Sequence, residues 1–124
     1  MTPVGLARYQ QVDVLTMSPA QRVLLLYNHL LVNLRRAKAA LEARDIAGRS
    51  TRVAKALDVL NELVFSLDRE NGGPLAERLA AIYVYLIGEI ARADREQDPA
   101  RLDRVIGLCA SLHEAWVEAA KQTE

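Results

Sequence analysis

The stretch SPAQRVLLLYNHLLVNL, residues 18–34, decides how this chain begins to fold. Ser18 can accept hydrogen bonds from the free backbone N–H groups of a first helical turn, and Pro19 suits the first position of a helix. An amphipathic helix needs apolar side chains at about three positions in seven. This stretch carries far more, so the helix has apolar surface beyond a single buried stripe.

Apolar residues spaced three and four apart predict four helices, because that spacing places them on one helix face. Gly48 lies in the expected first turn, and glycines 72 and 73 can end the second helix. The expected helices cover residues 19–43, 51–69, 74–96 and 99–120. Helices of similar length joined by short turns predict an all-α fold, an antiparallel up-down four-helix bundle.

Each expected helix turns one stripe toward the core. The predicted inward residues are Val23, Tyr27, Leu30, Leu34, Ala37 and Leu41 in the first helix, Val53, Ala56, Leu60, Leu63 and Leu67 in the second, Leu75, Leu79, Ile82, Tyr83, Leu86, Ile90 and Ala93 in the third, and Leu102, Val105, Cys109, Leu112 and Trp116 in the fourth. Residues 1–17 have few apolar positions and are expected to form an arm, or a short extra helix, lying on the bundle. Residues 18–121 would form the bundle and residues 122–124 a tail.

Composition narrows the class of protein. The chain has 124 residues, which fits one domain, and 16 basic residues balance 16 acidic ones. That balance argues against a protein that mainly coats nucleic acid or an anionic membrane. No apolar run approaches the roughly 20 residues that span a bilayer, and the N-terminal residues lack the pattern of a secretion signal. With one cysteine, which fits a reducing compartment, we expect a soluble cytoplasmic protein without membrane insertion.

Signals for catalysis or metal binding are weak. His29 and His113 lie on different expected helices, without partners at metal-ligand spacing. We expect His29 to be exposed, His113 to border the core, and Cys109 to be a small core residue. Glu89 is the one acidic residue near an inner edge, and one carboxylate makes no site. We therefore expect no enzyme activity, no cofactor and no metal, against the alternative of a metal-dependent bundle enzyme.

Several apolar residues fall outside the inward stripes. They are Leu25, Leu26 and Val32 in the first helix, Phe65 in the second, and Val84, Tyr85 and Ile87 in the third. A contiguous exposed apolar patch usually marks a partner site. Three candidates could cover these apolar residues: the N-terminal arm, a second copy of the chain, or an amphipathic helix of another protein lying in a groove.

Several sequence strings, taken in order, resemble one known family. The string YQQVDVLTMSP at residues 9–19, followed by LLLYN at 24–28, resembles the N-terminal signature of the flagellar secretion chaperone FliS family. VAKALDVLNELVFSLD at 53–68, IYVYL at 82–86 and EAW at 114–116 are similar to later stretches of the family. Two positions depart from its pattern: His29 replaces a usual glycine, and Val84 replaces an acidic residue between paired tyrosines.

The resemblance implies a chaperone without nucleotide hydrolysis that binds the C-terminal segment of flagellin in the cytoplasm. It would prevent premature polymerisation and present the subunit to the flagellar export apparatus, with the arm near the groove. The predicted partner-binding residues are Tyr9, Val14, Leu25, Leu26, Tyr27, Val32, Val84, Tyr85 and Ile87. Tyr27 also lies on an inward stripe, so plain core packing stays open there. The rival function is a structural dimerisation or adaptor module; the chain is expected to be a monomer or weak homodimer that binds no nucleic acid.

Overall fold

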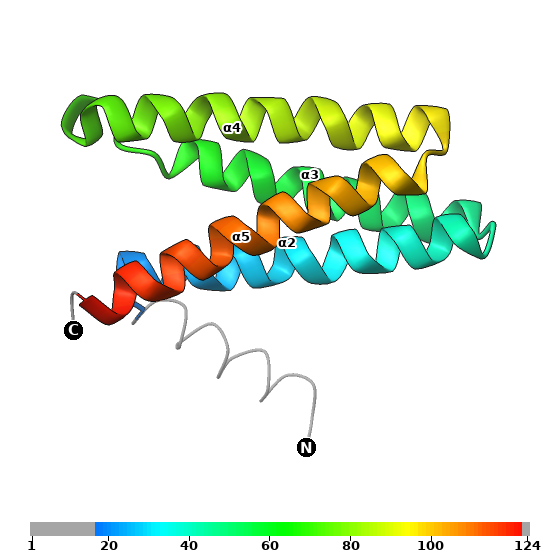
Figure 1. Cartoon of the computed structure of the whole chain (residues 1–124), viewed down its shortest axis with the longest axis horizontal. Helices are drawn as coiled ribbons and strands as arrows, with labels where there is room; N and C mark the ends of the chain where they lie inside the picture. The colour runs from blue at the N-terminus through cyan, green and yellow to red at the C-terminus, as the bar shows by residue number, and fades with distance from the viewer. Residues whose placement is uncertain (1–16, 123–124) are drawn as a thin grey trace, which may run out of the picture.

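The computed structural model describes residues 17–122, and this part of the chain folds into four α-helices without strands. The helices are α2 (Pro19–Glu42), α3 (Ile46–Phe65), α4 (Arg69–Glu96) and α5 (Pro99–Gln122). Consecutive helices run antiparallel and pack side by side, and α5 returns to pack against α2 (Figure 1). The expected antiparallel up-down four-helix bundle is confirmed. The expected arm and tail lie almost wholly outside the described residues.

The start of α2 follows directly from its first residues. The Ser18 hydroxyl accepts from the Gln21 backbone N–H at 3.2 Å, and the Gln21 side chain accepts from the Ser18 N–H at 3.1 Å. This reciprocal capping box satisfies two polar groups that the helix end would leave unpaired, and Pro19 occupies the first helical position.

The first loop is shorter than expected. Helix α3 begins at Ile46, where the Asp45 carboxylate accepts from the Gly48 N–H at 3.0 Å. The prediction that Gly48 lies in the loop is therefore wrong, because Asp45 caps the helix and Gly48 belongs to its first turn. The reversal instead uses Arg44, which adopts the left-handed conformation at φ 58°.

The second boundary also differs from the prediction. Helix α3 ends at Phe65, and a new helical turn begins at Arg69. The Asp68 carboxylate caps this turn, because it accepts a hydrogen bond from the Asn71 backbone N–H at 3.1 Å. Gly73 then interrupts α4 with φ 55° and ψ −141°, a conformation that favours glycine, before Pro74 continues the helix. Gly73 thus breaks α4 near its start, and neither Gly72 nor Gly73 ends the preceding helix, which stops at Phe65.

The core contains most of the predicted inward residues. Tyr27, Leu30, Leu34, Leu60, Leu86 and Ile90 are among the residues with 1% or less of their surface exposed. Leu75 is an exception, because 62% of its surface is exposed and Ala76 faces inward in its place. The helical period explains the difference: Ala76, Leu79 and Tyr83 follow one another in steps of three and four on the inward face, and Leu75 lies one residue away from that face. Val23, Ile82, Leu112 and Trp116 pack against the core while remaining partly exposed.

Each pair of neighbouring helices is joined by one ion pair. They are Arg22–Glu62 between α2 and α3, Lys38–Asp103 between α2 and α5, Arg49–Asp94 between α3 and α4, and Glu89–Arg101 between α4 and α5. The Arg22–Glu62 and Lys38–Asp103 pairs are the more exposed ones, and pairs of that kind contribute at most about 1 kcal/mol, whereas Glu89–Arg101 is mostly buried. Within residues 17–122, no helix has the length and apolar character needed to cross a membrane.

Candidate functional site

The predicted outer residues lie on two different sides of the bundle. Helices α2 and α4 are diagonal neighbours, each packed between α3 and α5 (Figure 1). Val32 on α2 is 42% exposed, and on α4 Val84 is 61% and Tyr85 55% exposed. The structure therefore does not bring the α2 and α4 residues together into one patch.

The other predicted residues vary in exposure. Leu25 and Leu26 are half-buried, and Leu26 lines a small hollow at the start of α2. Tyr27 is fully buried, so its side chain offers no surface to a partner, and Ile87 is half-buried against the core. Tyr9 and Val14 lie outside the described residues.

Helices α4 and α5 enclose two adjoining hollows, which together we call the α4–α5 groove. The hollows measure about 360 Å³ and about 430 Å³. They follow one another along the helices, since Ile82 and Tyr85 are one turn apart and Ser111 and Leu112 are consecutive. The sequence analysis identified Tyr85 but not the α5 side of the groove. Leu108 could have indicated that side, because it is an apolar residue outside the predicted stripe of its helix, and it is 47% exposed.

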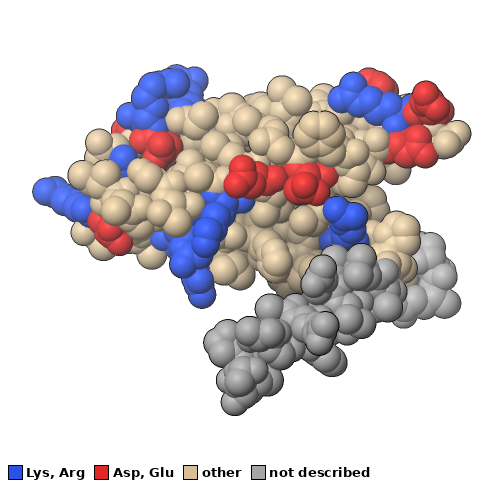
Figure 2. All heavy atoms as spheres, turned by 180° about the vertical axis from the view of Figure 1, so that it is seen from behind, with Lys and Arg blue, Asp and Glu red and all other residues tan. Residues whose placement is uncertain are grey.

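One half of the groove is apolar. Arg78 is the single charged residue that lines it. Its other lining residues are Leu75, Leu79, Ile82, Leu112, Ala115, Trp116 and Ala119. Helix α4 carries no charged residue between Arg78 and Glu89. Figure 2, which views the molecule from behind and so from the side away from α5, shows mostly uncharged surface along the upper edge, where α4 lies, with charged side chains toward its two ends. This half suits apolar side chains of a partner.

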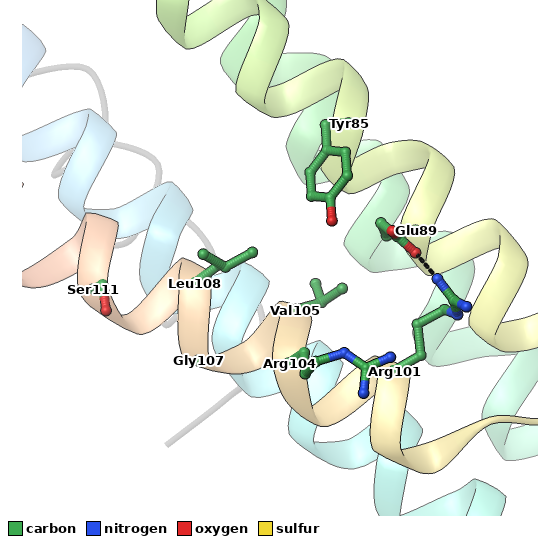
Figure 3. A pocket seen from close by; sticks show the side chains of 8 residues that line it. All are labelled: Tyr85, Glu89, Arg101, Arg104, Val105, Gly107, Leu108 and Ser111. Atoms are coloured by element: carbon green, nitrogen blue, oxygen red, sulfur yellow. Dashed lines mark hydrogen bonds and ion pairs between the residues drawn. The ribbon is translucent and has the colours of Figure 1, made fainter.

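The other half combines apolar and charged side chains, as Figure 3 shows. Tyr85 points from α4 toward α5, and Val105 and Leu108 lie across from it. Glu89 and Arg101 close the end of the groove with an ion pair of 2.5 Å. Hydrogen bonding from Arg101, and to a smaller extent from the Tyr85 hydroxyl, lowers the pKa of Glu89, so the carboxylate stays ionised at neutral pH.

A buried hydrogen-bond network supports the floor of the apolar half. The Tyr27 and Tyr83 hydroxyls are 2.7 Å apart, and the Trp116 indole N–H donates to Tyr27 at 3.2 Å. The His113 ring stacks on Tyr27 with centroids 6.2 Å apart. Burial raises the pKa of both tyrosines, so both hydroxyls stay protonated. Helices α2, α4 and α5 thus jointly position the Trp116 ring.

The described residues offer little for catalysis. They contain no group of three or more potential metal ligands. Cys109 is fully buried, and burial raises the pKa of its thiol to about 12, which leaves no thiolate at neutral pH. His29 is exposed and His113 is partly buried, as predicted. The arrangement is a groove between α4 and α5 with one apolar half and one half that also carries charged side chains.

Comparison with known proteins places the chain in a family. The model of the family described as flagellar protein FliS matches residues 4–123. The flagellar secretion chaperone FliS of Salmonella typhimurium is 32% identical over 120 residues, covering 93% of this chain and 89% of the relative. Its Bacillus subtilis counterpart is 32% identical over 111 residues, covering 90% and 82%. The Campylobacter jejuni protein of the same name is 34% identical over 101 residues, covering 82% and 79%.

A solved structure agrees on the fold. A crystal structure described as a flagellar chaperone from bacteria superposes with a TM-score of 0.79 at 17% sequence identity, covering 95% of this chain and 96% of that one. The relatives from Salmonella typhimurium and Bacillus subtilis are both named flagellar secretion chaperones. The ordered sequence match, over nearly the whole chain, shows that this protein belongs to the flagellar protein FliS family.

Proposed function

We propose that this protein is a cytoplasmic flagellar export chaperone that binds the C-terminal segment of flagellin. Family membership supports a role in flagellar export, and the relatives named above are flagellar secretion chaperones. The observation that carries the binding proposal is the α4–α5 groove, whose apolar half has exposed Leu75 at its rim and Trp116 in its lining. A flagellin helix would lay its apolar face into this groove.

The proposed mechanism is occupation and needs no chemical step. While the apolar face of flagellin lies in the groove, it is unavailable to other flagellin molecules, so premature polymerisation is prevented. Burial of apolar surface contributes about 25 cal/mol per Å², less the cost of ordering a flexible segment. Release at the flagellar export apparatus would then free the subunit for secretion.

The proposed contact surface includes residues predicted from the sequence and adds others from α5. Val84, Tyr85 and Ile87 belong to α4, and Tyr85 lines the groove directly. The α5 wall adds Leu108 and the Trp116 ring. The α2 residues Leu25, Leu26 and Val32, together with Tyr9 and Val14, form a second proposed contact region, away from the groove. Tyr27 would act only indirectly, by holding Trp116 through its hydroxyl.

Calorimetric titration with a synthetic flagellin C-terminal peptide tests the proposal. Leu108→Asp places a charge in the groove, and because Leu108 is 47% exposed the core stays intact. Phe65→Asp is the matched control, since Phe65 is 86% exposed and lies on α3. We expect Leu108→Asp to weaken binding by about tenfold or more, because docking would bury its charge. Phe65→Asp should bind as the wild type does.

Two results would overturn the proposal. One is the absence of binding by the wild type at peptide concentrations on the order of tens of micromolar. The other is equal weakening by Leu108→Asp and Phe65→Asp with matching melting temperatures. Leu25→Asp and Val32→Asp, measured in the same titration, test the α2 contact region. The rival dimerisation module predicts light scattering that rises with protein concentration to the mass of a dimer, and loss of that dimer in Leu108→Asp.

A further inference from the structure

Each hollow of the α4–α5 groove carries unpaired positive charge. Three arginines and one glutamate line the two hollows. Arg101 is occupied, because it pairs with Glu89 at 2.5 Å and approaches Asp98 at 3.6 Å. Arg78 and Arg104 are exposed, and neither forms an ion pair or a hydrogen bond with any residue between 17 and 122. Among the described residues, each hollow therefore has one free guanidinium group, and Ile82, Tyr85 and Leu108 lie between the two.

The spacing of the groove-lining residues indicates the shape of its occupant. On α4 the lining residues Leu75, Arg78, Ile82, Tyr85 and Glu89 follow one another in steps of three and four, and Leu79 lies beside Arg78 on the core side of this row. Such a seam is the surface against which another helix packs. A helix completing this seam would face both walls of the groove along its length.

The distance between the free arginines sets the spacing of complementary charges. Arg104 lines the same hollow as Glu89, and Arg78 precedes Glu89 by three helical turns on α4. At 1.5 Å per residue, Arg78 and Glu89 are about 16 Å apart along α4, and this sets the approximate spacing of the two positive charges along the groove. Residues about eleven positions apart in a partner helix lie on the same face at this separation.

We propose that the α4–α5 groove selects an amphipathic helix whose apolar face is bracketed by acidic residues about eleven positions apart, one for Arg78 and one for Arg104. This inference rests on the proposed function for the identity of the natural partner, a flagellin segment, and adds the pattern of acidic residues that the groove would recognise. The apolar half of the groove would bury the apolar side chains of the partner helix. The two arginines set the register, because a helix shifted by one turn would leave at least one carboxylate without a partner.

Designed peptides test the charge pattern independently of flagellin. Two helical peptides of about 18 residues share one apolar face and carry either glutamate or lysine at both bracketing positions. Titrated into the full chain at low salt, the glutamate peptide should bind about tenfold more tightly, and added salt should reduce that preference. The double variant Arg78→Gln/Arg104→Gln should remove the preference.

Arg95→Gln is the matched control, because Arg95 is an exposed arginine of the same helix that does not line the groove. It should keep the full preference, and all variants should melt near the wild-type temperature. Equal binding of the two peptides, no binding of either, or a preference that survives the double variant would overturn the inference. If the glutamate peptide behaves as expected while the flagellin peptide does not bind, the proposed function fails and the charge pattern of the groove stands.

Discussion

The hydroxyl of Tyr27 is predicted to stabilise the fold and the groove together. It contacts the Tyr83 hydroxyl at 2.7 Å and accepts from the Trp116 indole at 3.2 Å. Tyr27→Phe removes this atom and keeps the ring. Tyr83 is 1% exposed, so its hydroxyl would lose this short hydrogen bond inside the core. Trp116 is only partly buried, so water can replace its lost contact more easily.

The expected loss in the free energy of unfolding follows from the burial of Tyr83 and the partial exposure of Trp116. An unsatisfied buried polar group costs about 1–3 kcal/mol, and most of that cost belongs to Tyr83. We therefore expect Tyr27→Phe to lower the free energy of unfolding by about 2 kcal/mol. For a bundle of this size that corresponds to a fall in melting temperature of about 10 °C. The tryptophan emission should also change, because the indole loses the acceptor that positions it.

Urea unfolding followed by circular dichroism measures the effect. Tyr85→Phe is the matched control: it removes a hydroxyl from a residue that is 55% exposed and should change stability by less than about 0.5 kcal/mol. The double variant Tyr27→Phe/Tyr83→Phe should be no less stable than Tyr27→Phe, because both hydrogen-bonding partners are then gone. Stability of Tyr27→Phe within about 0.5 kcal/mol of the wild type, or additive losses in the double variant, would refute the reasoning.

Two further predictions concern the ends of α4. Gly73→Ala should lower the free energy of unfolding by about 1–3 kcal/mol in thermal melts, since φ 55° with ψ −141° strains any side chain, whereas Gly88→Ala in regular helix should not destabilise. Because Arg101 lowers the pKa of Glu89 below its ordinary value of 4.5, the stability this carboxylate contributes is complete above pH 4.5 and is lost as the pH falls through the lowered pKa. Glu89→Gln should therefore be less stable than the wild type at pH 7, and the difference should shrink toward pH 3; a difference that grows in acid would contradict this.

Local sequence determined the helices and most of the core. Apolar residues at steps of three and four, with Ser18 and Pro19 at a helix start, specify a helix whatever surrounds it, because the period belongs to the helix itself. The same reasoning correctly placed Tyr83 and Cys109 inside and Phe65 outside. The resemblance to the FliS family, carried by strings along the chain, agrees with the match over residues 4–123.

Loop geometry was less predictable, since it depends on which residue adopts a left-handed conformation. Gly48 was the expected residue of the first loop, but Arg44 makes the reversal because Asp45 caps α3. At the second boundary, Gly73 adopts a positive φ and interrupts α4 near its start. The spacing of apolar residues alone carries no information on which residue does so.

Only the tertiary structure decided where a partner can dock. A helical pattern shows that Val32 and Val84 face away from their own stripes, but it does not show which helices are neighbours. Packing places α2 and α4 diagonally, so these two residues lie on different sides of the bundle. The same packing sets α5 beside α4 and joins Tyr85 to Leu108 in one groove, with Arg78 in one of its hollows and Arg104 in the other. A groove belongs to two helices at once, so its position follows from their packing and not from the pattern of either one.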